Sequence, residues 1–537
     1  MKLIRKLWRP GAVWTALRLG GAALAVGLAL AAVTPTGAYA QEGAAAAATT
    51  TATTTATTTA ATAEVTPAAP AAAEAAPAAI AAPAQTVDKG DTTWMLISTA
   101  LVLVMTIPGL ALFYGGLVRS KNVGATIMQC SVIALIGMIM WALVGYSLSF
   151  TNGSGPLAPF IGGTSRFFLN DIVDGKVTDL SDNLAATFST GVYIPELLYV
   201  LFQMTFAAIT AALVMGALAE RVKFAGIVLF SIIWPLIVYY PMAHMVWFWA
   251  GPDAYATHTN GSTTDGFLFA KGALDFAGGS VVHINSGIAA LMGCLVLGRR
   301  TGYKTTQMPP HNLVWTYCGA GLLWFGWFGF NAGSNLESNY YAVLAMANTF
   351  LATAAAGLSW CLVEAVFKGK PSFLGLSSGI VAGLVAVTPA SGFAGPMGSI
   401  VLGLAVSPIC FVAVSFVKNL LGYDDALDVF GVHCIGGITG ALATGILVNP
   451  DLGGAGVVNY ADCAADGDIS TCPTAVYNFA AQMTSQGTDV IVTLLWSGVG
   501  SLAIWIVLRV LGLLRVSKDA EQEGLDLTSH GEQAYHT

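Results

Sequence analysis

Residues 276–298 read FAGGSVVHINSGIAALMGCLVLG and contain no Asp, Glu, Lys or Arg. They lie within a predicted helix at 270–298, which is long enough to cross a bilayer. The one side chain in this stretch that can carry a positive charge, His283, falls near the middle of the predicted helix. Ionisable groups at that depth are costly and usually face a cavity, a partner or a substrate path. A second apolar stretch, at 429–448, contains His433.

The composition of the whole chain is that of a helical membrane protein. Of its 537 residues, 55% are hydrophobic and 9% are charged, with a mean hydropathy of +0.70, whereas soluble proteins carry about 25% charged residues. We predict an all-α membrane domain over 91–512 with eleven transmembrane helices. The predicted helices are 93–117, 125–150, 192–218, 225–249, 270–298, 313–333, 339–366, 373–389, 396–417, 429–448 and 485–511.

The two ends of the chain differ from this domain. Residues 1–40 resemble a secretory signal peptide, with a basic start, an apolar run and the triplet Ala38-Tyr39-Ala40; the alternative is an uncleaved helix. Residues 41–90 are rich in Ala, Thr and Pro and are expected to be a disordered linker. Residues 513–537 form the predicted C-terminal tail.

The distribution of basic residues predicts the orientation. One set of alternate loops contains nearly all of them, and cytoplasmic loops carry such an excess. The N-terminus is therefore expected outside and the C-terminus inside, as the signal peptide also requires. The basic residues of the predicted cytoplasmic loops are Arg119, Lys121, Arg221, Lys223, Arg299, Arg300, Lys304, Lys368, Lys370 and Lys418.

A short internal repeat links the two intramembrane histidines. Residues 282–288 and 432–438 both read V-H-x-x-x-G-I, on the fifth and tenth predicted helices. An odd offset means that the two helices cross the membrane in opposite directions. This predicts a five-plus-five inverted repeat with a site between the halves near the midplane.

A structural role and a haem-binding role are the alternatives for the two histidines. A single buried histidine is commonly bonded to a backbone carbonyl, but two at matching repeat positions favour a lined path. A haem held by both imidazoles is disfavoured because no second histidine pair lies at membrane depth. We expect no metal and no cofactor, since no cysteine–histidine cluster is present. In one polar outer loop, Cys463 and Cys472 are candidates for a disulfide.

Further candidates flank the histidines. Asp275 precedes His283 by eight residues, about 12 Å along a helix, which suits a cap of local N–H groups or an electrostatic pull on a cation. Phe202 and Phe206 share one helix face. The aromatic belt at membrane interfaces is the alternative interpretation of the outer rings, although rings of this kind can also hold a cation.

Several motifs resemble those of the ammonium transporter family (Amt/Mep/Rh), of the bacterial Amt type. The strongest is LDFAGGSVVHIN at 274–285, followed by DVFGVH at 428–433 and GWFGFNAGS at 326–334. AHMVW at 243–247 and the IPG and YGG segments between 107 and 116 match too. The resemblance covers about residues 90–537.

This resemblance implies roles for individual residues. Trp247, Phe206 and Ser334 would form an outer recruitment site for ammonium, supported by Asp275. Phe206 and Phe330, with Phe202 beside them, would form the gate. His283 and His433 would be the twin histidines of the pore.

The resemblance also implies an assembly and a location. The expected protein is a homotrimer in the cell inner membrane, with methylammonium as a substrate analogue, and a cytoplasmic PII signalling protein is a possible partner; no nucleic acid is expected. The long loop between Trp247 and Asp275 and the loop carrying Cys463 depart from the pattern of close relatives. An ammonium sensor is the rival hypothesis, whereas no nucleotide motif or nucleophile elbow favours an enzyme.

Overall fold

The computed structural model describes residues 84–172, 183–259, 261, 263–463 and 472–535. This part contains eleven helical spans that are long and apolar enough to cross a membrane, the number predicted from the sequence. The predicted signal peptide and residues 41–83 of the predicted linker lie outside it. The spans are Lys89–Leu117, Ser120–Phe150, Glu196–Leu218, Phe224–Trp247, Gly279–Leu297, Leu313–Gly333, Tyr340–Lys368, Phe373–Ala390, Pro396–Leu421, Phe430–Leu447 and Phe479–Val510.

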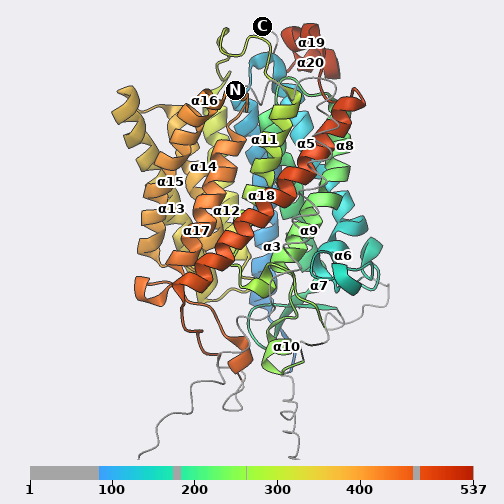
Figure 1. Ribbon diagram of the computed structural model, residues 1–537, viewed down its shortest axis with the longest axis vertical. Coiled ribbons are helices and arrows are strands. Elements are labelled where there is room, and N and C mark those ends of the chain that lie inside the picture. The colour runs from blue at the N-terminus through green and yellow to red at the C-terminus, as the bar shows by residue number, and fades with distance from the viewer. Residues whose placement is uncertain (1–83, 173–182, 260, 262, 464–471, 536–537) are drawn as a thin grey trace, which may run out of the picture.

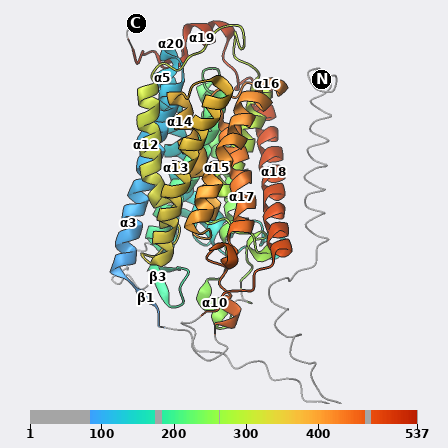
Figure 2. The same ribbon diagram turned by 90° about the vertical axis from the view of Figure 1, so that its left-hand side faces the viewer.

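The spans form one bundle with two distinct ends. Helix α18 (Phe479–Val510) crosses the bundle obliquely (Figure 1). The tail helices α19 (Lys518–Glu523) and α20 (Leu525–His530) lie at one end, here called the tail end. Helix α10 (Pro252–Ala256) lies at the opposite end, here called the loop end (Figures 1 and 2).

A small sheet at the loop end was not predicted from the sequence. Strand β3 (Val192–Pro195) pairs in parallel with β1 (Thr86–Val87) and antiparallel with β2 (Leu184–Ala186). Strands of two to four residues are too short to show an alternating pattern. The first span then begins at Lys89, inside the range assigned to the linker.

Six spans contain a π-helical segment, in which the backbone makes a wider turn. Proline accounts for two of these, because Pro108 and Pro235 lack the N–H that an α-helix needs. The segments are η1 (Met105–Gly109), η3 (Trp141–Gly145), η6 (Pro235–Tyr239), η9 (Gly279–Ile284), η11 (Ala413–Val417) and η12 (Phe430–Cys434). They adjoin α3 (Lys89–Val104), α4 (Leu110–Leu117), α5 (Val123–Met140), α6 (Tyr146–Phe150), α8 (Phe224–Trp234), α9 (Tyr240–Trp247), α11 (Asn285–Leu297), α15 (Pro396–Val412), α16 (Lys418–Leu421) and α17 (Ile435–Leu447).

Four of the remaining five spans begin with an ordinary side-chain N-cap, and the other, α7 (Glu196–Leu218), follows Pro195 without one. Helices α12 (Leu313–Gly333) and α13 (Tyr340–Lys368) follow Asn312 and Asn339, whose side chains accept from the first-turn N–H groups. Ser372 and Asn478 do the same for α14 (Phe373–Val387) and α18. Helix α7 is almost wholly buried at the centre of the bundle.

The fifth span begins nine residues later than the sequence predicts, at Gly279 rather than 270. Gly278 has a φ of 114°, a conformation that ends the helical path and suits glycine. The preceding residues form a loop whose aspartate side chain takes the free N–H groups of the helix start. Hydropathy alone cannot detect such a loop, because it is itself largely apolar.

The two repeat segments pack against each other through their glycines. A Cβ added at Gly287 would lie 2.4 Å from the backbone N of Cys434. One added at Gly437 would lie 2.8 Å from the backbone O of Gly279. The glycine of each V-H-x-x-x-G-I motif therefore permits close approach of the oppositely directed partner helix, as small residues do in membrane proteins.

Candidate functional site

The two repeat histidines meet at the centre of the bundle. His283 lies on η9 and His433 on η12, and their Nδ1 atoms are 3.2 Å apart. The rings are 1% and 4% exposed. Since one nitrogen must donate and the other accept, the neutral rings adopt different tautomers. Among the described residues, Nε2 of His283 has no hydrogen-bond partner.

A narrow cavity adjoins this pair. Its walls are aliphatic and aromatic apart from the imidazoles and the hydroxyl of Tyr114, which donates to the backbone O of Leu213. Such a lining offers few polar sites to a charged solute, because an unpaired charge is costly in apolar surroundings. The cavity is lined by Met105, Leu110, Phe113, Tyr114, Ile209, Leu213, Val282, His283, Leu323, Trp327, Phe330, Val381 and His433.

Two phenylalanine rings stack against each other beside the cavity. The centroids of Phe206 on α7 and Phe330 on α12 are 4.1 Å apart at 17°. Both side chains are fully buried, and Phe330 lies 6.2 Å from the ring of His283. Phe202 packs edge-on against Phe206 at 4.9 Å. The aromatic candidates from the sequence thus form one continuous cluster.

Trp247 and Ser334 lie on the loop-end side of the stacked rings. The ring of Trp247 meets Phe206 edge-on at 5.9 Å and 85°. Its indole N–H donates to the backbone O of Asp275 at 2.8 Å. The hydroxyl of Ser334 donates to the backbone O of Phe330 at 2.8 Å, which leaves its oxygen lone pairs to accept from a donor such as ammonium.

Asp275 caps the helix that carries His283. Its carboxylate accepts five hydrogen bonds, from the backbone N–H groups of Gly278, Gly279, Ser280 and Val281 and from the Ser280 hydroxyl. The side chain is 6% exposed. Capping was one of the two roles that the sequence suggested, and these contacts account for the depth at which the carboxylate sits.

A matching cap in the second half was not predicted from the sequence. Asp425, fully buried, accepts from the backbone N–H groups of Val429 at 3.1 Å and Phe430 at 2.8 Å. Burial raises the pKa of this carboxyl, against the opposing charge of Lys418. Asp275 precedes His283 by eight residues, and Asp425 precedes His433 by eight. That equal spacing is the signal that would have revealed it.

The histidine pair differs in its contacts from a purely structural histidine. His244 shows the ordinary core pattern, with ring nitrogens 3.0 and 2.8 Å from the backbone O atoms of Ser149 and Ala158, whereas His283 and His433 contact each other. Within the described ranges, no three His, Cys, Asp or Glu side chains gather as metal ligands.

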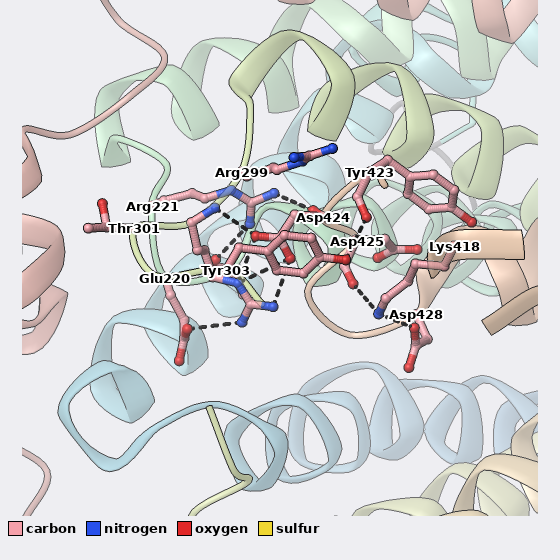
Figure 3. Close-up of polar contacts among 12 residues, drawn as sticks. Glu220, Arg221, Arg299, Thr301, Tyr303, Lys418, Tyr423, Asp424, Asp425 and Asp428 are labelled. Atoms are coloured by element: carbon pink, nitrogen blue, oxygen red, sulfur yellow. Dashed lines mark hydrogen bonds and ion pairs between the residues drawn. The ribbon is translucent and has the colours of Figure 1, made fainter. Parts of the chain in front are cut away.

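The tail end carries a network of buried charges (Figure 3). Arg300 pairs with Glu220 at 3.0 Å and with Asp424 at 2.8 Å, and Arg119 also pairs with Glu220 at 2.8 Å. Burial opposes ionisation of Glu220, but the nearby guanidinium groups outweigh it and lower its pKa to about 2. The pKa of Asp424 is lowered to about 2 in the same way, with Arg221 and Arg300 as the opposing charges.

The C-terminal tail is anchored onto this end. The carboxylate of Asp526 accepts from the backbone N–H groups of Gly124 and Ala125, in the first turn of α5. Glu521 accepts from the backbone N–H of Thr301 at 2.5 Å. The tail therefore contacts the start of the second span and the loop that follows the fifth span.

The loop end is elaborated. Cys463 and Cys472 form a disulfide, the pairing suggested by the sequence. Trp249 joins a cluster of rings that includes Tyr255 and Tyr460, with centroids at 5.8 and 5.3 Å. The two loops that depart from the family pattern thus have packed structure of their own.

The chain matches known proteins over nearly all of its described length. Residues 93–535 match the Ammonium Transporter Family. An ammonium transporter of Aquifex aeolicus is 44% identical, with 84% of this chain and 94% of that protein covered. One of Bacillus subtilis is 42% identical, with 84% and 99% covered.

Solved structures agree with these relatives. One titled "Sensor Amt Protein" has a TM-score of 0.69 at 25% identity, covering 82% of this chain and 98% of its own. Mep2 of Candida albicans has a TM-score of 0.65 at 32% identity, covering 81% and 87%. With matching sequence, fold and eleven spans, this multi-pass membrane protein belongs to the ammonium transporter family.

Proposed function

We propose that ammonium is bound at the loop end, gives up its proton at the stacked rings, and crosses as ammonia along the histidine pair. The observation that carries this proposal is the 3.2 Å contact between His283 and His433 beside an apolar cavity. Ammonia can enter such a cavity, whereas a bare ammonium ion there would lose its hydration without replacement.

The recruitment step rests on the groups outside the stacked rings. An ammonium ion beside Phe206 would meet the face of Trp247 and the oxygen of Ser334. Cation–π contact and a hydroxyl acceptor together replace part of its water shell. Asp275 contributes by fixing Trp247 through its backbone carbonyl and by adding negative charge near the entrance.

The proton follows through the imidazole pair. Two bonded rings, one donor and one acceptor, can pass a proton by exchanging tautomers, and they titrate as a pair. Net transport is then electrogenic, although ammonia and the proton move separately. Ammonium-induced current in proteoliposomes tests this step.

Uptake of labelled methylammonium by cells lacking their own ammonium transporters tests the proposal as a whole. His283→Asn should abolish uptake, and growth on low ammonium should be lost with it. His258→Asn is the matched control, because His258 lies exposed in an outer loop with a positive φ that asparagine tolerates. Equal uptake by both variants would contradict a conducting pair.

The orientation and assembly complete the proposal. The basic loops with Arg119, Arg221 and Arg300 lie at the tail end, which supports a cytoplasmic tail and an outer loop end in the inner membrane. By family resemblance, the chain forms a homotrimer and its tail end receives a PII signalling protein. Light scattering in detergent and co-purification with PII would test these two points.

A sensing role is the second candidate. It is favoured by the likeness to the structure titled "Sensor Amt Protein" and by the anchoring of the tail to the membrane bundle. A chain that binds methylammonium but does not accumulate it in cells would favour sensing over transport.

A further inference from the structure

Polar side chains of α18 form hydrogen bonds with the loop that carries Asp275. Ser485 Oγ donates to the backbone O of Lys271 at 2.6 Å. One helical step further, Gln486 accepts from the backbone N–H of Leu274 at 2.7 Å and donates to its backbone O at 2.9 Å. These bonds hold the loop against the last helix.

Asp489 continues this polar stripe, one turn beyond Ser485. It is fully buried within the span. Among the described residues, no hydrogen bond of standard geometry reaches either carboxyl oxygen, although the hydroxyls of Ser280 and Thr493 lie against it. An intramembrane carboxyl usually has a function, and neither the recruitment site nor the histidine pair uses this one.

The two neighbouring carboxyls have opposite surroundings. Asp275 accepts five hydrogen bonds, four of them from backbone N–H groups at a helix start, and these stabilise a negative charge. Asp489 has no such donors among the described residues. Both carboxyls adjoin Ser280, and two buried carboxylates that share a neighbour are not both charged, so the proton belongs on the one without backbone N–H donors.

We propose that Asp489 is a protonated carboxylic acid that positions Asp275 through Ser280. The Ser280 hydroxyl already donates to Asp275 at 2.6 Å, so its lone pairs are left for the O–H of Asp489. The hydroxyl of Thr493, also without a partner among the described residues, can donate to the Asp489 carbonyl. The chain then runs from Asp489 through Ser280 to the ionised Asp275, each bond strengthening the next.

This chain connects α18 to the proposed transport site, so its functional effect rests on the proposed function. Asp275 caps η9, which carries His283, and its backbone O fixes Trp247. Asp489 is not one of the residues that line the cavity or form the stacked rings. It is therefore a positioning residue for the outer entrance.

Two substitutions test the role in transport. Asp489→Asn keeps a neutral donor and acceptor and should transport methylammonium within about twofold of the original chain. Asp489→Leu removes the bond to Ser280 and should lower kcat/KM about five- to tenfold, the size expected for one lost hydrogen bond to a charged network. Thr484→Leu, on an exposed face of α18, is the control for helix packing.

Infrared spectroscopy of the purified protein in bilayers reads the protonation state directly, whether or not the protein transports. The difference spectrum between the original chain and Asp489→Asn should show the carbonyl band of a protonated acid at pH 7. Absence of that band overturns the assignment. So does loss of transport in Asp489→Asn equal to that in Asp489→Leu, or a Leu variant with unchanged kcat/KM.

Discussion

Substitution of Gly287 by alanine should separate the two histidines. The added Cβ would lie 2.4 Å from the backbone N of Cys434. Ordinary contact begins near 3.4 Å, so η12 must move by about 1 Å, since backbone cannot rotate away as a side chain can. The Nδ1–Nδ1 distance of 3.2 Å would then exceed hydrogen-bonding range.

The expected result is loss of transport with only moderate loss of stability. Overpacking of this kind costs about 1–3 kcal/mol, which a large bundle tolerates. Methylammonium uptake in transporter-deficient cells measures the first effect. Thermal unfolding of the detergent-purified protein, followed by size-exclusion chromatography, measures the second.

Gly321→Ala is the matched control. Gly321 lies on α12 with no atom within 4 Å of an added Cβ, so alanine should leave transport intact and raise helix stability by up to about 1 kcal/mol. Full uptake by a well-folded Gly287→Ala protein would refute the reasoning, because it would mean that the pair does not depend on this close contact.

Three further predictions concern the caps, the charge network and the disulfide. Asp275→Ala leaves four backbone N–H groups without an acceptor and should lower the free energy of unfolding by about 4 kcal/mol. Asp425→Ala leaves two without an acceptor and should lower it by about 2 kcal/mol. Equal losses in thermal unfolding would contradict the count of hydrogen bonds. Because the pKa of Glu220 is lowered to about 2, its contribution of about 3 kcal/mol to the free energy of unfolding is present above pH ~4.5 and is lost as the pH falls towards 2. Glu220→Gln should therefore reduce the fall of the unfolding midpoint with decreasing pH in this range. An unchanged fall would exclude this charge network as the cause of the acid sensitivity. Cys463→Ser with Cys472→Ser opens a loop of sequence separation 9, which should speed proteolysis of that loop while methylammonium uptake stays normal; a lost uptake would place the loop in the transport path.

The spans and the histidine pair could be predicted from the sequence because their signals are strong. Long apolar stretches identify the helices, and two imidazoles at matching depth stand out in such surroundings. The repeat indicates opposite directions for the two helices. These facts predict that both histidines lie near one midplane, and the structure adds that their rings are in contact.

The loop before the fifth span and the polar face of α18 could not be predicted in the same way. Residues 270–278 are apolar enough to look like part of the span, but the left-handed Gly278 and the hydrogen bonds to Asp275 make the span begin at Gly279. The last helix is predicted to begin at 485 but begins at Phe479, because its early polar residues bind the loop rather than water. Hydropathy does not distinguish buried polar groups with partners from exposed ones.

The π-helical segments could not be predicted from the hydropathy pattern either. A π-helical segment changes which side chains share a helix face. His283 lies on one such segment, η9, and His433 lies on another, η12. Asp425 was not predicted because the family-like motif begins at a different aspartate, Asp428. Asp428 instead pairs with Lys418 at 2.5 Å.

Current across proteoliposome membranes on addition of ammonium is the most direct test of the histidine pair. We predict a transient current with the original chain, the same current with His258→Asn, and none with His283→Asn or His433→Asn. Ammonia flux, followed by an internal pH dye in the same vesicles, should accompany the current. Ammonia flux without current in the original chain, or an undiminished current in the His283 variant, would contradict proton transfer through the pair.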